Sequence, residues 1–265
     1  MLHHVIIGSG RPVLVLHGST LDHRHMRDSL EPIFAQQDGW QRIYIDLPGH
    51  GLSPAQDDIA TQDDLLASVL AFIDQALPNQ RFAIIGESRG SYLARGITYL
   101  RPEVVTGLAL IVPGGNPSAD PARLPAHEII EPDPSLRAGL KDEELEHFDN
   151  FMVVQRQDVI ERIRRVIDPA QALWDKAQAD RIWTAFDFSF HRELETTQFT
   201  GPSVIIAGRF DSWSGYRDAI DLVPQFPRAT LGVLDAAGHS LAGERPDIFA
   251  ALIHDWLARL SKVPT

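Results

Sequence analysis

A serine, an aspartate and a histidine each follow a short hydrophobic run of the sequence, at Ser88, Asp211 and His239. A serine hydroxyl is a weak nucleophile until a base removes its proton, and histidine is the side chain that most often acts as such a base. A carboxylate can in turn orient the histidine. If the fold brings these side chains together, they could perform nucleophilic catalysis.

Ser88 is the central residue of the pentapeptide Gly86-Glu87-Ser88-Arg89-Gly90. A strand-like run precedes this pentapeptide and a helix-like run follows it, which is the context of a tight turn that exposes a serine side chain. The two glycines fit such a turn because a sharp bend at Ser88 leaves no room for Cβ atoms two residues to either side. The pentapeptide alone is a weak signal, so the interpretation depends on the rest of the chain.

These residues need a scaffold that gathers the ends of strands, and the hydrophobic pattern predicts one. Runs typical of buried strands alternate with segments of helical spacing. The predicted strands cover residues 13–16, 42–45, 82–85, 105–112, 203–207 and 230–234, and the predicted helices cover residues 26–34, 65–73 (with Thr61 and Asp64 as cap), 92–100 and 248–260. This alternation favours an α/β fold with a mostly parallel, doubly wound sheet, in which functional groups lie just beyond the carboxyl ends of strands.

The alternation stops near Pro113 and resumes after residue 199. The sequence between these points is rich in proline at first and then charged and helical, with helices expected at 143–166 and 170–186 and no strand signal. We predict a core domain of residues 1–112 and 200–265 and a helical cap insertion of residues 113–199. The aromatic residues expected to fold over Ser88 are Trp174, Trp183, Phe186 and Phe190. The alternative is a set of surface helices with no part in the chemistry.

The composition excludes several classes of function. The 265 residues are 44% hydrophobic and 23% charged, as in ordinary soluble globular proteins. The net charge of −12 repels polyanions, which argues against nucleic acid and anionic membranes as partners. Cysteine is absent, so disulfides, thiolate metal sites and a cysteine nucleophile are excluded. No run approaches the roughly 18 apolar residues of a membrane span, and no signal-peptide pattern opens the sequence, so we expect a cytoplasmic protein.

Taken together, the motifs resemble those of the α/β-hydrolase fold family, and in particular its capped serine esterases and lactonases. The order serine, aspartate, histidine along the chain is the order of that family. The matching motifs are His17-Gly18, Asp46-Leu47-Pro48-Gly49-His50-Gly51, Gly86-x-Ser88-x-Gly90, Gly208-Arg209-Phe210-Asp211 and Ala237-Gly238-His239. The resemblance covers nearly the whole chain. Fewer residues precede Gly8 than in many relatives, so we expect shortened N-terminal strands and a sheet of about seven strands.

The resemblance implies a role for each site residue. Ser88 would attack an acyl carbon, His239 would act as base and then as acid, and Asp211 would fix the imidazole tautomer. The backbone N–H groups of Ser19 and Arg89 would form the oxyanion hole. The implied activity is hydrolysis of a small ester, thioester or lactone through an acyl-enzyme. The implied partner is a small-molecule acyl substrate, with no cofactor and no metal, and the chain would act as a monomer or homodimer.

Other activities use the same triad and stay open. Within enzymes these are C–C bond hydrolysis, hydroxynitrile cleavage and cofactor-free haloperoxidase-like chemistry. Haloalkane dehalogenation is disfavoured, because those enzymes have an aspartate at the position of Ser88. A ligand-binding receptor that retains the triad is the alternative from another class.

Several site residues also have structural interpretations. Asp211 could cap the segment that starts at Ser212, and His239 could be a surface histidine. The loop after Val112, where some relatives carry the acid, offers Asn116 and no carboxylate before Asp120. We expect Asp46 and His50 to bind the backbone of their own turn, and His17 to bind backbone near the oxyanion hole. The run Asp22-His23-Arg24-His25 contains metal-ligand types, but its helical surroundings favour a solvated helix start.

The charged residues on both sides of Ser88 depart from the family pattern. Relatives more often carry a neutral or aromatic residue after the serine. Arg89 could form an ion pair with Glu87 or with another acid, which is the interpretation we favour. It could instead bind a substrate that carries a carboxylate.

Overall fold

A single sheet forms the centre of the computed structural model, which describes residues 1–114 and 120–264. Its strands have the spatial order β1-β3-β2-β4-β5-β6-β7. The strands are β1 (His4–Gly8), β2 (Arg11–Leu16), β3 (Trp40–Ile45), β4 (Phe82–Glu87), β5 (Val105–Ile111), β6 (Ser203–Gly208) and β7 (Ala229–Leu234). Only β1 is antiparallel to its neighbour, β3, and the other pairs are parallel. The predicted seven-stranded, mostly parallel sheet with a short N-terminal part is confirmed.

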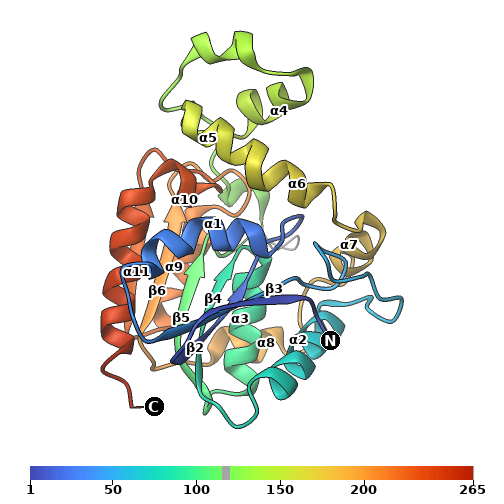
Figure 1. Cartoon of the computed structure of the whole chain (residues 1–265), viewed down its shortest axis with the longest axis vertical. Helices are drawn as coiled ribbons and strands as arrows, with labels where there is room; N and C mark the ends of the chain where they lie inside the picture. The colour runs from blue at the N-terminus through green and yellow to red at the C-terminus, as the bar shows by residue number, and fades with distance from the viewer. Residues whose placement is uncertain (115–119, 265) are drawn as a thin grey trace.

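Helices cover both faces of this sheet, as a doubly wound arrangement requires. Figure 1 shows α1 and α11 on one side of the strands and α2 and α3 on the other. The helices are α1 (His23–Phe34), α2 (Gln62–Ala76), α3 (Arg89–Leu100), α4 (Asp142–Asn150), α5 (Gln157–Arg162), α6 (Asp168–Gln171), α7 (Lys176–Trp183), α8 (His191–Thr196), α9 (Tyr216–Asp221), α10 (Leu241–Glu244) and α11 (Pro246–Leu260). The helices predicted from apolar spacing at α1, α2, α3 and α11 are therefore confirmed.

The continuous hydrophobic runs arise because both faces of the parallel strands are buried. In β2, Val13 and Val15 pack in the cluster with α1 and α11, while Leu14 and Leu16 pack in the cluster with α2 and α3. Helix α2 begins at the predicted cap, where the N–H of Asp64 donates to Thr61 Oγ1 over 3.1 Å and the Asp64 carboxylate accepts the N–H of Thr61. This pairing satisfies two N–H groups that a helix start leaves free.

The predicted helix over residues 143–166 is wrong in its middle. Helix α4 ends at Asn150, and an extended segment follows before α5 begins at Gln157. The N–H of Ile130 donates to the carbonyl of Val153 over 2.8 Å, and Val153 and Val154 are fully buried. Adjacent β-branched residues favour an extended backbone, so burial of this valine pair beside another chain segment interrupts the helix.

The inserted segment packs in two different ways. Its α4–α6 part has a hydrophobic cluster of its own, made by Phe148, Met152, Val159, Ile160, Ile163, Val166 and Ile167. Further along, Ile182, Phe186 and Leu194 belong to the main core cluster. Figure 1 shows α4, α5 and α6 above the end of the sheet toward which β5 and β6 point. The division into a core of 1–112 plus 200–265 and a cap of 113–199 stays a prediction.

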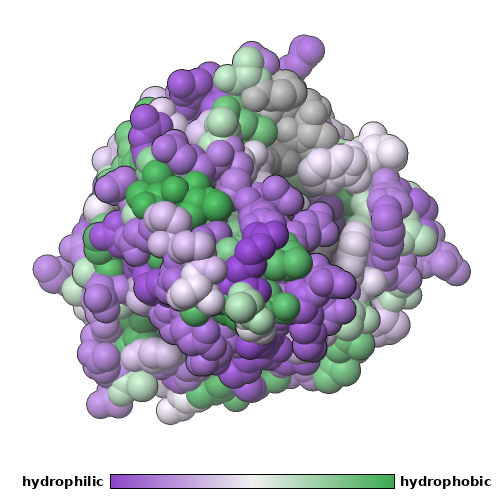
Figure 2. All heavy atoms as spheres, turned by 90° about the horizontal axis from the view of Figure 1, so that it is seen from above, coloured by the Kyte–Doolittle hydropathy of each residue, from purple (hydrophilic) through white to green (hydrophobic). Residues whose placement is uncertain are grey.

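The surface over this end of the molecule is mostly hydrophilic and is interrupted by hydrophobic patches (Figure 2). Across residues 1–114 and 120–264, no helix combines the length and the apolar character needed to cross a membrane.

Candidate active site

The turn around Ser88 joins β4 directly to α3. Ser88 has φ 51° and ψ −118°, a conformation that non-glycine residues rarely adopt and that marks stored backbone strain. A Cβ added to Gly86 would lie 2.3 Å from the carbonyl oxygen of Gly90, and one added to Gly90 would lie 2.4 Å from that of Leu16. Both glycines are therefore required by close backbone approach, as the sequence indicated.

Asp211 and His239 lie beyond the ends of the neighbouring strands β6 and β7. Nδ1 of His239 is 2.9 Å from Oδ2 of Asp211. The other oxygen, Oδ1, accepts the backbone N–H groups of Trp213 and Ser214, each over 2.9 Å. Asp211 thus caps the segment after it, as one interpretation held, and pairs with His239 as well. These bonds fix the carboxylate and favour the proton on Nδ1, which leaves a lone pair on Nε2.

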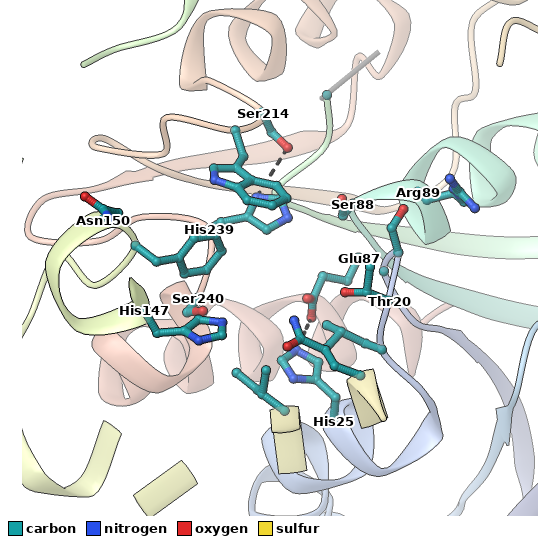
Figure 3. A pocket seen from close by; sticks show the side chains of 18 of the residues that line it. Thr20, His25, Glu87, Ser88, Arg89, His147, Asn150, Ser214, His239 and Ser240 are labelled. Atoms are coloured by element: carbon teal, nitrogen blue, oxygen red, sulfur yellow. Dashed lines mark hydrogen bonds and ion pairs between the residues drawn. The ribbon is translucent and has the colours of Figure 1, made fainter. Parts of the chain in front are cut away.

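The electrostatic surroundings of His239 favour its protonated form. Burial alone would lower the pKa of His239, but the carboxylates of Asp211 and Glu87 raise it above the ordinary histidine value. The hydroxyl of Ser214 is a further polar neighbour, 3.3 Å from Nδ1 (Figure 3). An imidazole with a raised pKa is a stronger base and accepts a proton from a nearby hydroxyl more readily.

Ser88 and His239 line one cavity of about 460 Å³. The part of the chain outside the inserted segment contributes lining residues that include Ser19, Ser88, Trp213 and His239. The inserted segment contributes Glu146, His147, Asn150, Phe151, Ile167, Gln171, Trp183 and Phe186. Of the aromatic residues expected over Ser88, Trp183 and Phe186 do line the cavity. Trp174 lines a separate depression beside Gly49, and Phe190 stacks on Tyr99 and Phe188.

The loop after β2 approaches Ser88 closely. A Cβ added to Gly18 would lie 3.2 Å from the Cβ of Ser88. His17 holds this loop, since its Nδ1 is 2.7 Å from the Gly18 carbonyl and its Nε2 accepts the N–H of Leu47. Burial lowers the pKa of His17, which keeps Nε2 able to accept. The predicted backbone-binding role of His17 is confirmed. In the part of the chain that the structure describes, the N–H groups of Ser19 and Arg89 donate to no protein acceptor.

Glu87 pairs with a histidine that the sequence did not connect to the site. Nε2 of His25 lies 2.9 Å from Oε2 of Glu87, and both side chains are buried (Figure 3). Although burial raises the pKa of Glu87, the nearby His25 lowers it below the ordinary value overall. Arg162 of α5 continues the network, with Nη2 3.4 Å from Nδ1 of His25 and an ion pair to Asp28. An acid beside Ser88 is thereby linked to the inserted segment.

The prediction that Asp22-His23-Arg24-His25 is a solvated helix start is wrong. Asp22, His23 and His25 are all buried. Asp22 accepts the N–H of Arg24 and caps α1, while His23 and His25 each bond a carboxylate of another element. The apolar face of α1 begins at Met26. The first turn of α1 contacts the carboxylates of Asp46 and Glu87, so the polar residues before Met26 are buried as well. Their types alone gave no sign of this.

The favoured pairing of Arg89 with Glu87 or another acid is also wrong. Arg89 is 3% exposed and lines the cavity, yet among the described residues it forms no ion pair, and its Nε and Nη1 have no hydrogen-bond partner. Its guanidinium lies 5.7 Å from the centroid of the Phe186 ring. Burial lowers the pKa of Arg89 to about 10, so the side chain stays charged at neutral pH.

The contact with Phe186 does not replace the missing partners of Arg89. A cation over an aromatic ring contributes about 0.5–2 kcal/mol. Each buried donor left without an acceptor costs about 1–3 kcal/mol, and more when the group is charged. Two such donors therefore leave a net cost at Arg89 in the structure as it stands. Arg89 differs from the buried Arg95 in lacking a paired carboxylate among the described residues, since Arg95 pairs with Glu195 over 2.5 Å and Nε is its one buried nitrogen without a partner.

A second residue missed by the sequence is Glu244 of α10. It is buried, and its carboxylate accepts the N–H of Gly238 over 2.7 Å and that of Val153 over 3.1 Å. Burial raises the pKa of Glu244 above its usual range. The residue ties the loop that carries His239 to the extended part of the inserted segment. A glutamate in a short helix carries no sequence signal for such a role.

His3, His23 and Asp46 could in principle hold a metal ion, because their ligand atoms lie within 4.8 Å of one another. Nδ1 of His3 and Nδ1 of His23 are 2.7 and 2.8 Å from the Asp46 carboxylate, which also accepts the N–H groups of His23 and Leu52. These are hydrogen-bond distances, and both oxygens of the Asp46 carboxylate already accept hydrogen bonds. The cluster therefore fits a structural network better than a metal centre. Although Asp46 is buried, its hydrogen bonds hold its pKa well below the usual range. The predicted structural role of Asp46 is confirmed.

The remaining predicted residues lie apart from the chemistry. Nδ1 of His50 is 2.9 Å from the carbonyl of Pro48 within its own turn, and burial lowers the pKa of His50 to about 3. This fits the predicted structural role. Asp120 is exposed and accepts the N–H of Ala122. Asn116, the other residue considered in the loop after β5, lies outside the described residues.

Comparisons with known proteins agree with the fold. A sequence profile of the alpha/beta hydrolase fold matches residues 11–246. A crystal structure of an alpha/beta superfamily hydrolase from Oenococcus oeni PSU-1 superposes with a TM-score of 0.88 and 26% sequence identity, over 98% of this chain and 96% of that one.

Two curated relatives match to different extents. The 2-hydroxy-6-oxononadienedioate/2-hydroxy-6-oxononatrienedioate hydrolase 2 of Pseudomonas putida is 25% identical over 97% of this chain and 91% of its own length. A serine hydrolase-like protein of Danio rerio is 36% identical over 104 residues, which are 38% of this chain and 31% of that relative. The second match thus spans less than a third of the fish protein.

Proposed function

Because the chain belongs to the α/β-hydrolase fold family, whose profile spans residues 11–246, we propose that it is a serine hydrolase that cleaves a small ester, thioester or lactone through an acyl-enzyme. Ser88 is the proposed nucleophile, His239 the general base and Asp211 the residue that orients His239. The proposed oxyanion donors are the backbone N–H groups of Ser19 and Arg89. The inserted segment 113–199 is the proposed cap, since several of its side chains line the cavity.

The observation that carries this proposal is the pair formed by Asp211 and His239, of which His239 lines the same cavity as Ser88. The 2.9 Å contact between Nδ1 and Oδ2 supports the tautomer in which Nε2 accepts a proton. The strained turn at Ser88 supports the same role, because it presents the hydroxyl beyond the end of β4. A cavity of about 460 Å³ matches the usual size of small-molecule sites.

The proposed reaction has two halves. In the first, Ser88 Oγ bonds to the acyl carbon while its proton passes to Nε2 of His239. The oxyanion that forms is held by the two backbone N–H groups. The bond to the leaving group then breaks, and His239 returns the proton to the departing oxygen or sulfur. In the second half, water takes the place of the serine hydroxyl, and the acid is released with Ser88 restored.

The test is the variant Ser88→Ala, assayed for hydrolysis of p-nitrophenyl acetate and for labelling by a fluorophosphonate probe. We expect turnover to fall by about 10⁴-fold or more, and labelling to disappear. Ser189→Ala, at an exposed serine far along the inserted segment, is the matched control and should keep both. Undiminished labelling of Ser88→Ala would remove Ser88 from the proposal. A chain-length panel of p-nitrophenyl esters beside acyl lactones then defines the substrate.

C–C bond hydrolysis is a second candidate, and the near full-length match to a dienedioate hydrolase favours it. A compound of that name has no ester or lactone bond, so its hydrolysis breaks a bond between carbons. The two candidates differ in a direct assay. A C–C hydrolase removes the ultraviolet–visible absorbance of a 2-hydroxy-6-oxodienoate at a rate well above its turnover of esters, whereas an esterase shows the reverse order.

A further inference from the structure

Arg89 is a buried cation that faces a cavity and has no counter-ion among the residues that the structure describes. It lines the same cavity as Ser88, with 3% of its surface exposed. Within residues 1–114 and 120–264 no carboxylate pairs with it, and Nε and Nη1 have no acceptor. A guanidinium presents its N–H groups as a planar fork that fits the two oxygens of a carboxylate. The structure therefore holds an arrangement that an anionic group entering the cavity would complete.

We propose that Arg89 is a binding site for a carboxylate carried by the acyl part of the substrate. The inference rests on the proposed serine hydrolase function and deepens it. The substrate class that follows is the monoester of a short dicarboxylic acid. Its free carboxylate would bind the guanidinium, and its esterified end would meet Ser88.

The position of Arg89 decides which part of the substrate carries the charge. His239 must reach the leaving group in order to protonate it, so the leaving group lies on the His239 side of Ser88. Figure 3 shows Arg89 on the other side of Ser88 from His239. The acyl chain, which stays attached to Ser88, extends away from the leaving group and therefore toward Arg89. A carboxylate on the alcohol part would point away from the guanidinium.

The length of the acyl chain is limited by the same residue. Arg89 supplies both a proposed oxyanion donor, through its backbone N–H, and the guanidinium. The distance between the free carboxylate and the reacting carbonyl is therefore limited to about the length of one arginine side chain. This limit favours dicarboxylic acids of about four to six carbons. The guanidinium of Arg89 lies over the ring of Phe186, and Trp183 packs edge to face against the same ring. Apolar walls therefore flank the methylene chain of the proposed substrate.

The negative charge of Glu87 does not cancel this site. Glu87 is directed toward His25, with which it pairs, and Figure 3 shows this pair away from the Arg89 guanidinium. The net charge of −12 acts over the whole surface, and salt screens it beyond about 8 Å at physiological ionic strength. A contact inside the cavity is screened far less. Binding of an anion there depends on the local guanidinium and not on the overall charge.

The test compares two esters that differ only in the terminal carboxylate, monomethyl glutarate and methyl pentanoate. Acid release in a pH-stat gives kcat/KM for each, and the readout is the ratio of the anionic to the neutral ester. We expect Arg89→Gln to lower this ratio by about 10- to 100-fold, as loss of a charge-assisted bond does. Arg89→Lys, which keeps the charge without the fork, should retain part of the preference. Arg95→Gln, at a buried arginine already paired with Glu195, should leave the ratio unchanged.

A second measurement tests the same site without turnover, for use if methyl esters react too slowly for kinetics. Glutarate should protect Ser88 of the wild type from fluorophosphonate labelling at a lower concentration than pentanoate does, and Arg89→Gln should remove the difference. The carboxylate site is overturned if the kcat/KM ratio, or the difference in protection between the two acids, is the same within twofold in the wild type and in Arg89→Gln while Ser88 still labels. That result leaves the hydrolase proposal standing. Failure of the wild type to label at Ser88 overturns the hydrolase proposal itself.

Discussion

Oε2 of Glu87 lies 2.9 Å from Nε2 of His25, so the acid immediately before the candidate nucleophile is paired with a histidine from the first turn of α1. Arg162 of α5 is 3.4 Å from the other nitrogen of His25. The charge beside Ser88 is thus held in place by residues from two other parts of the chain. This charge also acts on His239, whose pKa it raises.

Replacing Glu87 by glutamine should change the pH dependence of the reaction. His239 must be neutral to act as base, so kcat/KM rises with pH through the pKa of His239. Asp211 and Glu87 both raise that pKa, and loss of the Glu87 charge lowers it. We therefore expect the acid limb of the kcat/KM profile to move to lower pH in Glu87→Gln. Glu146→Gln, at another acid that lines the cavity, is the control and should keep the limb in place. An unmoved or raised limb in Glu87→Gln would contradict the coupling.

Replacing Asp211 by asparagine should nearly abolish turnover without unfolding the loop. The amide oxygen can still accept the N–H groups of Trp213 and Ser214, but the group facing Nδ1 loses its charge and no longer favours the required tautomer. The expected fall in kcat is about 10⁴-fold. Ser214→Ala removes only the weaker 3.3 Å contact and should cost less than about tenfold. Steady-state kinetics of both variants, with circular dichroism for folding, make the comparison. Equal losses in the two would contradict the pairing of Asp211 with His239.

Replacing Glu244 by alanine should destabilise the protein. The change leaves the buried N–H groups of Gly238 and Val153 without acceptors. At about 1–3 kcal/mol for each of the two groups, the expected loss is about 2–6 kcal/mol. The matching fall in Tm is roughly 4–24 °C for a chain of this size. Glu193→Ala, at an exposed acid of α8, should change Tm by no more than about 2 °C. A Tm for Glu244→Ala within that margin would show that the two N–H groups find other partners.

The glycine at the end of the turn should tolerate no side chain. A Cβ at position 90 would lie 2.4 Å from the carbonyl oxygen of Leu16 in the neighbouring strand, and backbone on both sides must then move. We expect Gly90→Ala to lower the free energy of unfolding by about 3 kcal/mol or more. Gly139→Ala is the matched control, since an added Cβ there meets no atom within 4 Å, and it should be neutral within about 1 kcal/mol. Urea denaturation of the two variants tests this, and similar midpoints would mean that the turn relaxes freely.

The sequence predicted well those features that depend on local pattern. Buried parallel strands are hydrophobic on both faces, so runs such as Val13–Leu16 mark them directly. The pentapeptide around Ser88 combines a strand, glycines and a helix in one short window. Because parallel strands end at one edge, the positions of Asp211 and His239 after their strands were enough to predict that they would meet.

The sequence predicted poorly those features that depend on which distant segments touch. The burial of His25 arises from its contact with Glu87, 62 residues away, and nothing near either residue indicates it. The helix predicted through Val153 is broken because that residue pairs with another part of the inserted segment. The ion pair expected for Arg89 is absent among the described residues, because the nearby acid Glu87 already pairs with His25. Polar partnerships over long separations carry no periodic signal.

The point at which the inserted segment leaves the sheet has a consequence for how such chains diversify. The segment departs after β5 and returns at β6, and these strands are neighbours joined by parallel pairing from Leu108 with Ser203 to Ile111 with Ile206. Length and sequence between them can therefore vary without altering the register of the sheet. The stretch from Ile182 onward is constrained because its side chains fill the main core. The earlier part is held by other contacts, which include those of Val153 with Glu244 and of Arg162 with His25. Recombination that exchanges the earlier part could alter substrate choice while Ser88, Asp211 and His239 are inherited unchanged.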